Sequence, residues 1–225
     1  MELQYQGRTL TYVINRKNMK TVRVRVKEDG IIHVSAPPAA SEAFIRRFLL
    51  ENAAELVRLL DNVEKRKANA PDYTDGSAIP HLGGKLTLCF HAAPCPTVRK
   101  EDTLHIFARN PQEAQLAVRQ WEISECVELY KCINREVYEH FRKEGFEVPL
   151  AHIQIKEMVS RWGSCTAATG RISMNFRLMR YPIESIYGVF YHEYTHFLHQ
   201  DHSPQFYELL LRMYPEYRRW DALLK

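Results

Sequence analysis

Residues 182–206 read PIESIYGVFYHEYTHFLHQDHSPQF, and this stretch decides how the second half of the chain folds. Pro182 is a favourable helix start, and at about 100° per residue the apolar side chains that follow share one helix face. His192 and His196 lie on nearly the opposite side. The pattern predicts a helix that packs its apolar stripe on a core and turns its histidines to a cleft. The stripe consists of Ile183, Ile186, Tyr187, Phe190, Tyr194, Phe197 and Leu198.

His192-Glu193-Tyr194-Thr195-His196 is an HExxH motif. Histidines four residues apart lie one turn apart on the same helix face, so both imidazoles can reach one ion. Glu193 points to a neighbouring sector, where it can touch a metal-activated water without binding the metal. The motif therefore predicts a Zn²⁺ site with Glu193 as the catalytic base.

A catalytic zinc ion takes three protein ligands and keeps one position open, so one more ligand must follow the motif. His199 lies on the same face as His192 but about 10 Å along the axis, too far for a shared ion while the helix stays regular. Ser203-Pro204 pairs a helix cap with proline at the first helical position, so the chain must turn before it. That turn can bring His202 over the pair. We predict the ligands His192, His196 and His202, with Glu208, Glu216 and His199 as the alternatives for the third position.

Working outward, the rest of the second half reads as mainly helical, and the first half as strand-rich. Asn110-Pro111-Gln112-Glu113 starts a long helix, or two in tandem, that runs to about Gly145. Segments 153–159 and 171–176 alternate like strands and predict one hairpin. We expect an α+β fold with two domains and no internal repeat. Residues 1–109 form a strand-rich N-terminal module with one helix, which starts at Ser41, and residues 110–225 form a helical catalytic domain with a short hairpin.

The composition is that of a globular protein of 225 residues with a formal charge of +4. Residues 1–30 hold seven Lys and Arg, which could meet nucleic acid but more simply form a solvated strand face. No stretch approaches the ~20 apolar residues of a membrane span, and no N-terminal apolar run indicates a signal peptide. The five cysteines form no CxxC pair. We therefore expect neither a structural zinc ribbon nor a disulfide framework. This cysteine usage suits a reducing compartment, so we expect a cytoplasmic location.

Some side chains outside the motif are candidates for the cleft. Arg161 and Trp162 lie where the first strand of the predicted hairpin ends, and an extended substrate could pair with such a strand. Both are candidate substrate-binding residues, with a packed tryptophan beside a tight glycine turn as the alternative. Cys165 reads as a half-buried thiol rather than a ligand, and Arg161 and Tyr207 are candidate oxyanion donors. The aromatic run that contains Tyr217 reads as core, and the scattered histidines, including His91 and His105, receive no role.

Residues 153–206 resemble the YgjP-like metal-dependent hydrolases of the zincin superfamily, which are related to the SprT and WLM metalloproteases. The resemblance extends loosely over most of the chain and implies a zincin-like catalytic domain with HExxHx5H ligation. Tyr194 stands where leucine is usual, but it lies on the apolar stripe. The resemblance rests on Trp162-Gly163-Ser164-Cys165, Asn175, Pro182 and His192-Glu193-x-x-His196-x5-His202-Ser203-Pro204-x-Phe206.

The motif and the resemblance together predict a zinc metallopeptidase that acts on a peptide or protein substrate and does not involve a membrane. Four alternatives remain open. The protein could hydrolyse another kind of amide, or act like SprT relatives on DNA-bound proteins. It could also be a nucleic-acid-associated metal-binding module, or a metal-binding pseudoenzyme or toxin-type partner protein.

Overall fold

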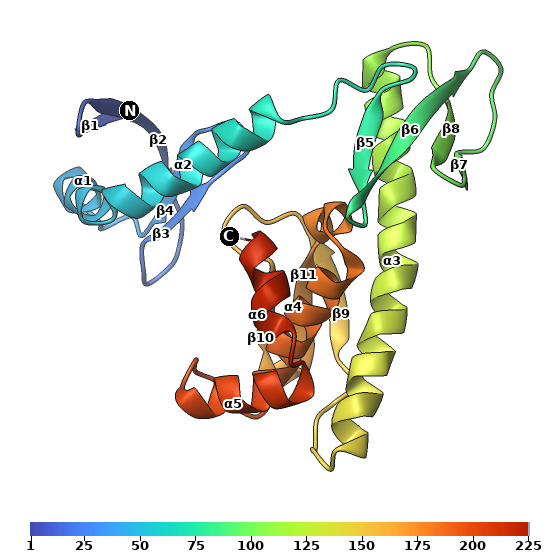
Figure 1. Ribbon diagram of the computed structural model, residues 1–225. Helices are drawn as coiled ribbons and strands as arrows, with labels where there is room; N and C mark the ends of the chain where they lie inside the picture. The colour runs from blue at the N-terminus through green and yellow to red at the C-terminus, as the bar shows by residue number, and fades with distance from the viewer. Residues whose placement is uncertain (225) are drawn as a thin grey trace. The chain divides into compact units, whose positions relative to one another are not determined.

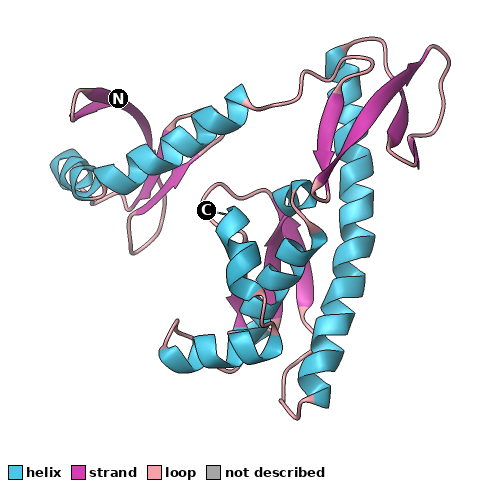
Figure 2. Ribbon diagram, viewed as in Figure 1, coloured by secondary structure: helices cyan, strands magenta, loops and turns pink. Residues whose placement is uncertain are grey.

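The computed structural model describes residues 1–224, apart from the side chain of Arg66. Contacts divide the chain into two compact units, Met1–Ala70 and Pro71–Lys225. The described residues form six α-helices and three small mixed sheets (Figures 1 and 2). The fold is therefore α+β. No helix in this part of the chain is long and apolar enough to cross a membrane.

The first unit is a four-stranded sheet followed by two helices. The sheet has the order β1-β2-β4-β3, in which β2 and β4 are parallel and the outer pairs are antiparallel. Ser41 caps the first helix as predicted, since its Oγ accepts a hydrogen bond from the Phe44 amide at 3.1 Å. The single helix expected here is broken at Asn52, whose side-chain amide donates to the Phe48 carbonyl at 2.8 Å. The elements are β1 (Glu2–Tyr5), β2 (Arg8–Arg16), β3 (Arg23–Val26), β4 (Ile32–Ala36), α1 (Glu42–Glu51) and α2 (Ala53–Ala68).

The second unit opens with a sheet of the same design. Its order, β5-β6-β8-β7, again places two parallel strands in the centre and antiparallel strands outside. The turn between the first two strands also matches in the two sheets, because both residues of Gln6-Gly7 and both residues of Leu82-Gly83 have positive φ. No repeat is visible in the sequence, because what the two sheets share is strand order and pairing rather than a run of matching residues. The strands are β5 (Ala78–His81), β6 (Gly84–His91), β7 (Val98–Lys100) and β8 (Thr103–Phe107).

Helix α3 (Pro111–Lys143) runs along both this sheet and the C-terminal part of the unit (Figure 1). It begins at the predicted start: Asn110 Oδ1 accepts from the Glu113 amide at 2.9 Å, and the Glu113 carboxylate accepts from the amide of Arg109, the residue before the cap, at 3.0 Å. The compact unit begins at Pro71, whereas the sequence analysis placed a domain boundary near residue 109. The difference arises because strands before residue 109 share a core with α3. That core contains Ile79, Leu86, Leu88, Leu104, Ile106, Ala114, Val118 and Trp121.

A third sheet has the order β10-β11-β9, with strands β9 (His152–Lys156), β10 (Gly163–Thr166) and β11 (Arg171–Asn175). The sequence analysis predicted that segments 153–159 and 171–176 form one hairpin, and this is wrong. Strand β9 pairs parallel with β11, and the hairpin is formed by β10 and β11. Asn175 explains the difference. Its side-chain amide donates to the carbonyls of Met158 and Arg161, both at 2.8 Å, and so folds the segment after β9 into a loop.

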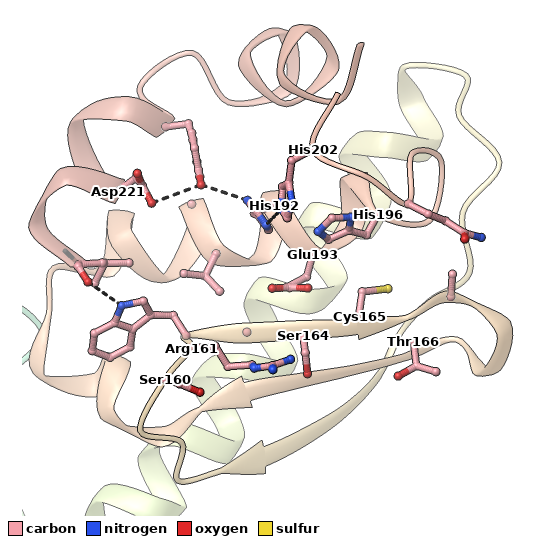
Figure 3. A pocket seen from close by; sticks show the side chains of 18 of the residues that line it. Ser160, Arg161, Ser164, Cys165, Thr166, His192, Glu193, His196, His202 and Asp221 are labelled. Atoms are coloured by element: carbon pink, nitrogen blue, oxygen red, sulfur yellow. Dashed lines mark hydrogen bonds between the residues drawn. The ribbon is translucent and has the colours of Figure 1, made fainter. Parts of the chain in front are cut away.

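The C-terminal helices α4 (Ile183–Thr195), α5 (Pro204–Met213) and α6 (Tyr217–Asp221) share a buried core with the rest of α3 and the third sheet. Ile186, Phe190 and Tyr194 of α4 are fully buried in that core, as the apolar stripe predicts. The Tyr194 hydroxyl donates to Asn134 Oδ1 at 2.7 Å. The histidine-bearing side of α4 is therefore left to face β10 and the cavity described next (Figure 3).

Candidate functional site

The structure brings His192, His196 and His202 together on the side of α4 that lines the cavity (Figure 3). One ring nitrogen from each lies within 4.8 Å of the others. Nε2 of His192 and Nε2 of His202 are 3.1 Å apart. Three imidazole nitrogens that converge in this way form a donor set that fits a divalent metal ion.

His202 reaches the pair because α4 ends where the sequence requires it to end. The amides of Phe197 and Leu198 bond carbonyls three residues back, at 3.0 Å each, which tightens the last turn. Ser203 then caps α5, its Oγ accepting from the Phe206 amide at 3.5 Å. The short turn between the two helices holds His202 over α4.

Two of the histidines are oriented by hydrogen bonds to their second ring nitrogen. Nδ1 of His192 lies 3.0 Å from the Tyr217 hydroxyl, which in turn donates to Asp221 Oδ1 at 3.3 Å. Nδ1 of His196 lies 3.0 Å from the backbone carbonyl of His199. If each Nδ1 carries the proton, each Nε2 keeps its lone pair for an ion, which is the usual arrangement around metal-bound histidine.

Phe206 forms the floor of the cluster. Its buried ring lies 4.9, 4.7 and 4.9 Å from the rings of His192, His196 and His202, measured between centroids. Burial lowers the pKa of His192 to about 4, with smaller contributions from the other two histidines, and burial also lowers the pKa of His196. Both shifts favour the neutral ring, the form that binds metals.

Glu193 lies beside the histidines and is only 4% exposed. Burial raises the pKa of its carboxyl to about 8, against the opposing effects of Arg161 and the Cys165 backbone amide. The carboxylate packs directly over Gly163, where an added Cβ would lie 2.4 Å from Glu193 Oε1. Only glycine leaves room for the carboxylate at this point.

A cavity of about 790 Å³ extends from the histidines along β10 (Figure 3). Arg161 lines it and is the one Lys or Arg among the described lining residues. Trp162 also lines it, but the indole N–H donates to the Leu224 carbonyl at 2.7 Å and the ring packs edge-on against Tyr181. Burial raises the pKa of the Cys165 thiol to about 12, which keeps it protonated.

The alternative third ligands are not brought to the histidine cluster. Glu208 and Glu216 are absent from the converging group, and Glu216 instead accepts from the Trp220 indole at 3.1 Å. His199 contributes its backbone carbonyl to His196 rather than its ring. Tyr207 is 39% exposed and, within the described chain, does not line the cavity.

A family model for the YgjP-like metallopeptidase domain matches residues 20–225. The chain belongs to the YgjP-like family. Searches among curated proteins and among solved structures found no match. Membership makes this YgjP-like protein a hydrolase of the metallopeptidase type and implies a metal, in agreement with the resemblance seen in the sequence.

Sequence reasoning missed three residues of this YgjP-like site. Gly163 was treated as a tight turn, although it belongs to the Trp162-Gly163-Ser164-Cys165 segment on which the resemblance rests. Tyr217 was assigned to a core aromatic run, and Asp221 received no role. The position of Gly163 depends on how β10 packs against α4, and those of Tyr217 and Asp221 depend on how α6 packs against α4, which no local pattern reports.

Proposed function

We propose that this protein is a zinc-dependent peptidase, with zinc bound by His192, His196 and His202 and with Glu193 as general base. One observation carries the proposal. Three imidazole nitrogens within 4.8 Å of one another share a cavity with the buried carboxyl of Glu193, which lies on the same helix turn as His192 and His196. A purely structural metal site has no use for that carboxyl.

The donor set suits zinc in chemistry and spacing. Zinc favours neutral imidazole and takes three protein ligands when one position serves catalysis. At Zn–N distances of about 2.0–2.1 Å, two nitrogens of a tetrahedral site lie about 3.3 Å apart. The 3.1 Å between Nε2 of His192 and Nε2 of His202 is close to that value.

Bound zinc would supply Lewis-acid chemistry, polarising the substrate carbonyl and making water a better nucleophile. Glu193 would accept a proton on a carboxylate oxygen from the attacking water and return it to the leaving amine. A nearby dication favours the charged carboxylate, which offsets the effect of burial on the pKa of Glu193. Arg161, the cation of the cavity, is our candidate for contact with the substrate carbonyl.

The preference for a peptide substrate rests on β10. This strand pairs with β11 on one side only, and its residues Gly163–Thr166 line the cavity. An edge strand beside a catalytic group can bind an extended peptide by adding it to the sheet. Trp162 lines the cavity too, but its contacts with Leu224 and Tyr181 suit a role in fixing the start of this strand.

The basic N-terminal segment does not favour a nucleic-acid function in the same way. Arg8 pairs with Asp61 and Glu64, and Arg16 donates to the Pro37 and Ala40 carbonyls. Two of the seven basic side chains of this segment are thus engaged within the first unit, and no described contact of the segment points to nucleic acid, so we do not extend the proposal to DNA-bound substrates.

A peptide-library assay tests the proposal. Zinc-loaded protein should cleave a subset of peptides, a chelator should abolish cleavage, and added zinc should restore it. Cleavage of small acyl-amides but of no peptide would favour the amidohydrolase alternative. Zinc binding without any hydrolysis would leave a metal-binding protein and contradict the proposal.

A further inference from the structure

A second group of metal-ligating side chains lies on the central strands of the sheet β5-β6-β8-β7. Cys89 and His91 are two residues apart on β6 and therefore share one face of the sheet. His105 stands directly opposite Cys89 on the parallel strand β8. Leu88 and Ile106, which alternate with them, are buried in the core shared with α3. The three side chains thus lie on the face turned away from that core, and none of them lines the cavity.

The spacing of the donor atoms matches a metal site. Nε2 of His91 is 3.0 Å from Nδ1 of His105 and 4.0 Å from Sγ of Cys89, and all three atoms lie within 4.8 Å of one another. In a tetrahedral zinc site, with Zn–N of about 2.0–2.1 Å and Zn–S of about 2.3 Å, these separations are about 3.3 and about 3.6 Å. Seating an ion would change these two separations by a few tenths of an ångström and would draw the donor atoms of Cys89 and His105, now within 4.8 Å, closer together.

The N-terminal sheet has the same strand pairing without the set of Cys, His and His at the equivalent positions, so the fold itself does not require these donors. In its equivalent register, Val13 on β2 stands opposite His33 on β4, as Cys89 stands opposite His105. Asn15 follows Val13 as His91 follows Cys89. The lone His33 lies 3.3 Å from Asp29 instead. The same scaffold thus occurs twice, and among the described residues only the second copy gathers three ligands.

We propose that Cys89, His91 and His105 bind a second zinc ion, which cross-links β6 and β8. A thiolate combined with two imidazoles suits zinc, whereas calcium and magnesium prefer oxygen ligands. Cys95, in the loop after β6, is not among the converging groups. Three protein ligands leave the fourth position to solvent. The competing explanation is a plain hydrogen bond between the His91 and His105 rings.

Cobalt titration of the full-length protein separates these explanations. Co²⁺ bound by thiolate gives a strong near-ultraviolet charge-transfer band, which a site built only of histidines does not give. The wild-type protein should show this band with about one thiolate-bound ion per chain, and zinc should displace it. Cys89→Ser should remove the band, and His91→Ala and His105→Ala should each weaken binding by about ten-fold or more.

The matched control is Cys132→Ser, which removes an exposed thiol of α3 outside both clusters and should leave the band intact. His196→Ala should also leave it intact, so failure here is distinguishable from failure of the helix site. Unchanged circular dichroism would show that each variant is folded. No band in the wild type, or a band that survives Cys89→Ser, would overturn the proposal and leave only a hydrogen bond between two imidazoles.

Discussion

The two clusters of ligating side chains are built on different scaffolds. His192 and His196 come from one turn of a helix, so their proximity is set by local geometry. Cys89, His91 and His105 are joined by the register of two parallel strands, with Cys89 and His105 sixteen residues apart in the sequence. The first cluster carries a buried glutamate beside a cavity, whereas the converging group on the sheet contains no carboxylate.

This difference teaches that ligands alone do not make a catalytic site. Hydrolysis needs an open metal position, a base within reach and a space for the substrate. The helix cluster has a candidate for each, because Glu193 lies over Gly163 in the wall of the cavity. The sheet cluster would leave one metal position to solvent, but its converging group contains no carboxylate to act as a base and does not line the cavity, so it lacks what hydrolysis needs.

The largest expected effect comes from removing a ligand of the helix cluster. His196→Ala should abolish the activity and lose the zinc ion of that cluster while the chain stays folded. His202→Ala should weaken zinc binding far more than His199→Ala or Glu208→Ala, because neither the ring of His199 nor the carboxylate of Glu208 is among the converging ligands. Zinc content is best counted in a Cys89→Ser background, so that only the helix cluster contributes. Full retention of zinc in His196→Ala would contradict the assignment.

Gly163→Ala should give the next largest effect. The new methyl group would overlap Glu193 Oε1, so the carboxylate must move while the histidines stay. A base displaced by about 1 Å should cost on the order of 10²-fold in kcat, with zinc content unchanged.

Gly84→Ala is the matched control, because its added Cβ meets only the His81 carbonyl at an ordinary 3.6 Å. Steady-state kinetics of the two variants, alongside their zinc content, decide the point. Equal activities would show that Gly163 does not position Glu193.

Tyr217→Phe should have the smallest effect. It removes the hydroxyl that links His192 Nδ1 to Asp221 but keeps the ring. Loss of such an outer partner should weaken zinc affinity by about ten-fold, measured by competition with a chelator of known affinity.

Tyr214→Phe provides the comparison. The Tyr214 hydroxyl donates to the Glu184 carbonyl at 3.0 Å and has no bond to the histidines, so zinc affinity should be unchanged. If both variants bind zinc as the wild type does, the Tyr217 hydroxyl does not tune the site.

The same contrast explains what could be predicted from the sequence. The apolar stripe of α4, the Asn110 and Ser203 caps and the turn before Pro204 follow local rules, and each was found in the structure. The placement of β9 beside β11, the repeated sheet and the sheet cluster depend on which strands pair. Strand register joins residues far apart in the chain, so spacing rules for CxxC or HExxH motifs cannot reveal it.

Replacing Glu193 with glutamine separates metal binding from chemistry and so tests the role of Glu193 as general base. Glutamine keeps the shape of the side chain but cannot act as a general base. Zinc content and peptide cleavage should be measured on the same preparation of Glu193→Gln and of the wild type. We predict unchanged zinc with a loss of activity of ~10²-fold or more. Loss of zinc would make Glu193 a ligand, and undiminished cleavage would exclude it as the base; either result would contradict the account.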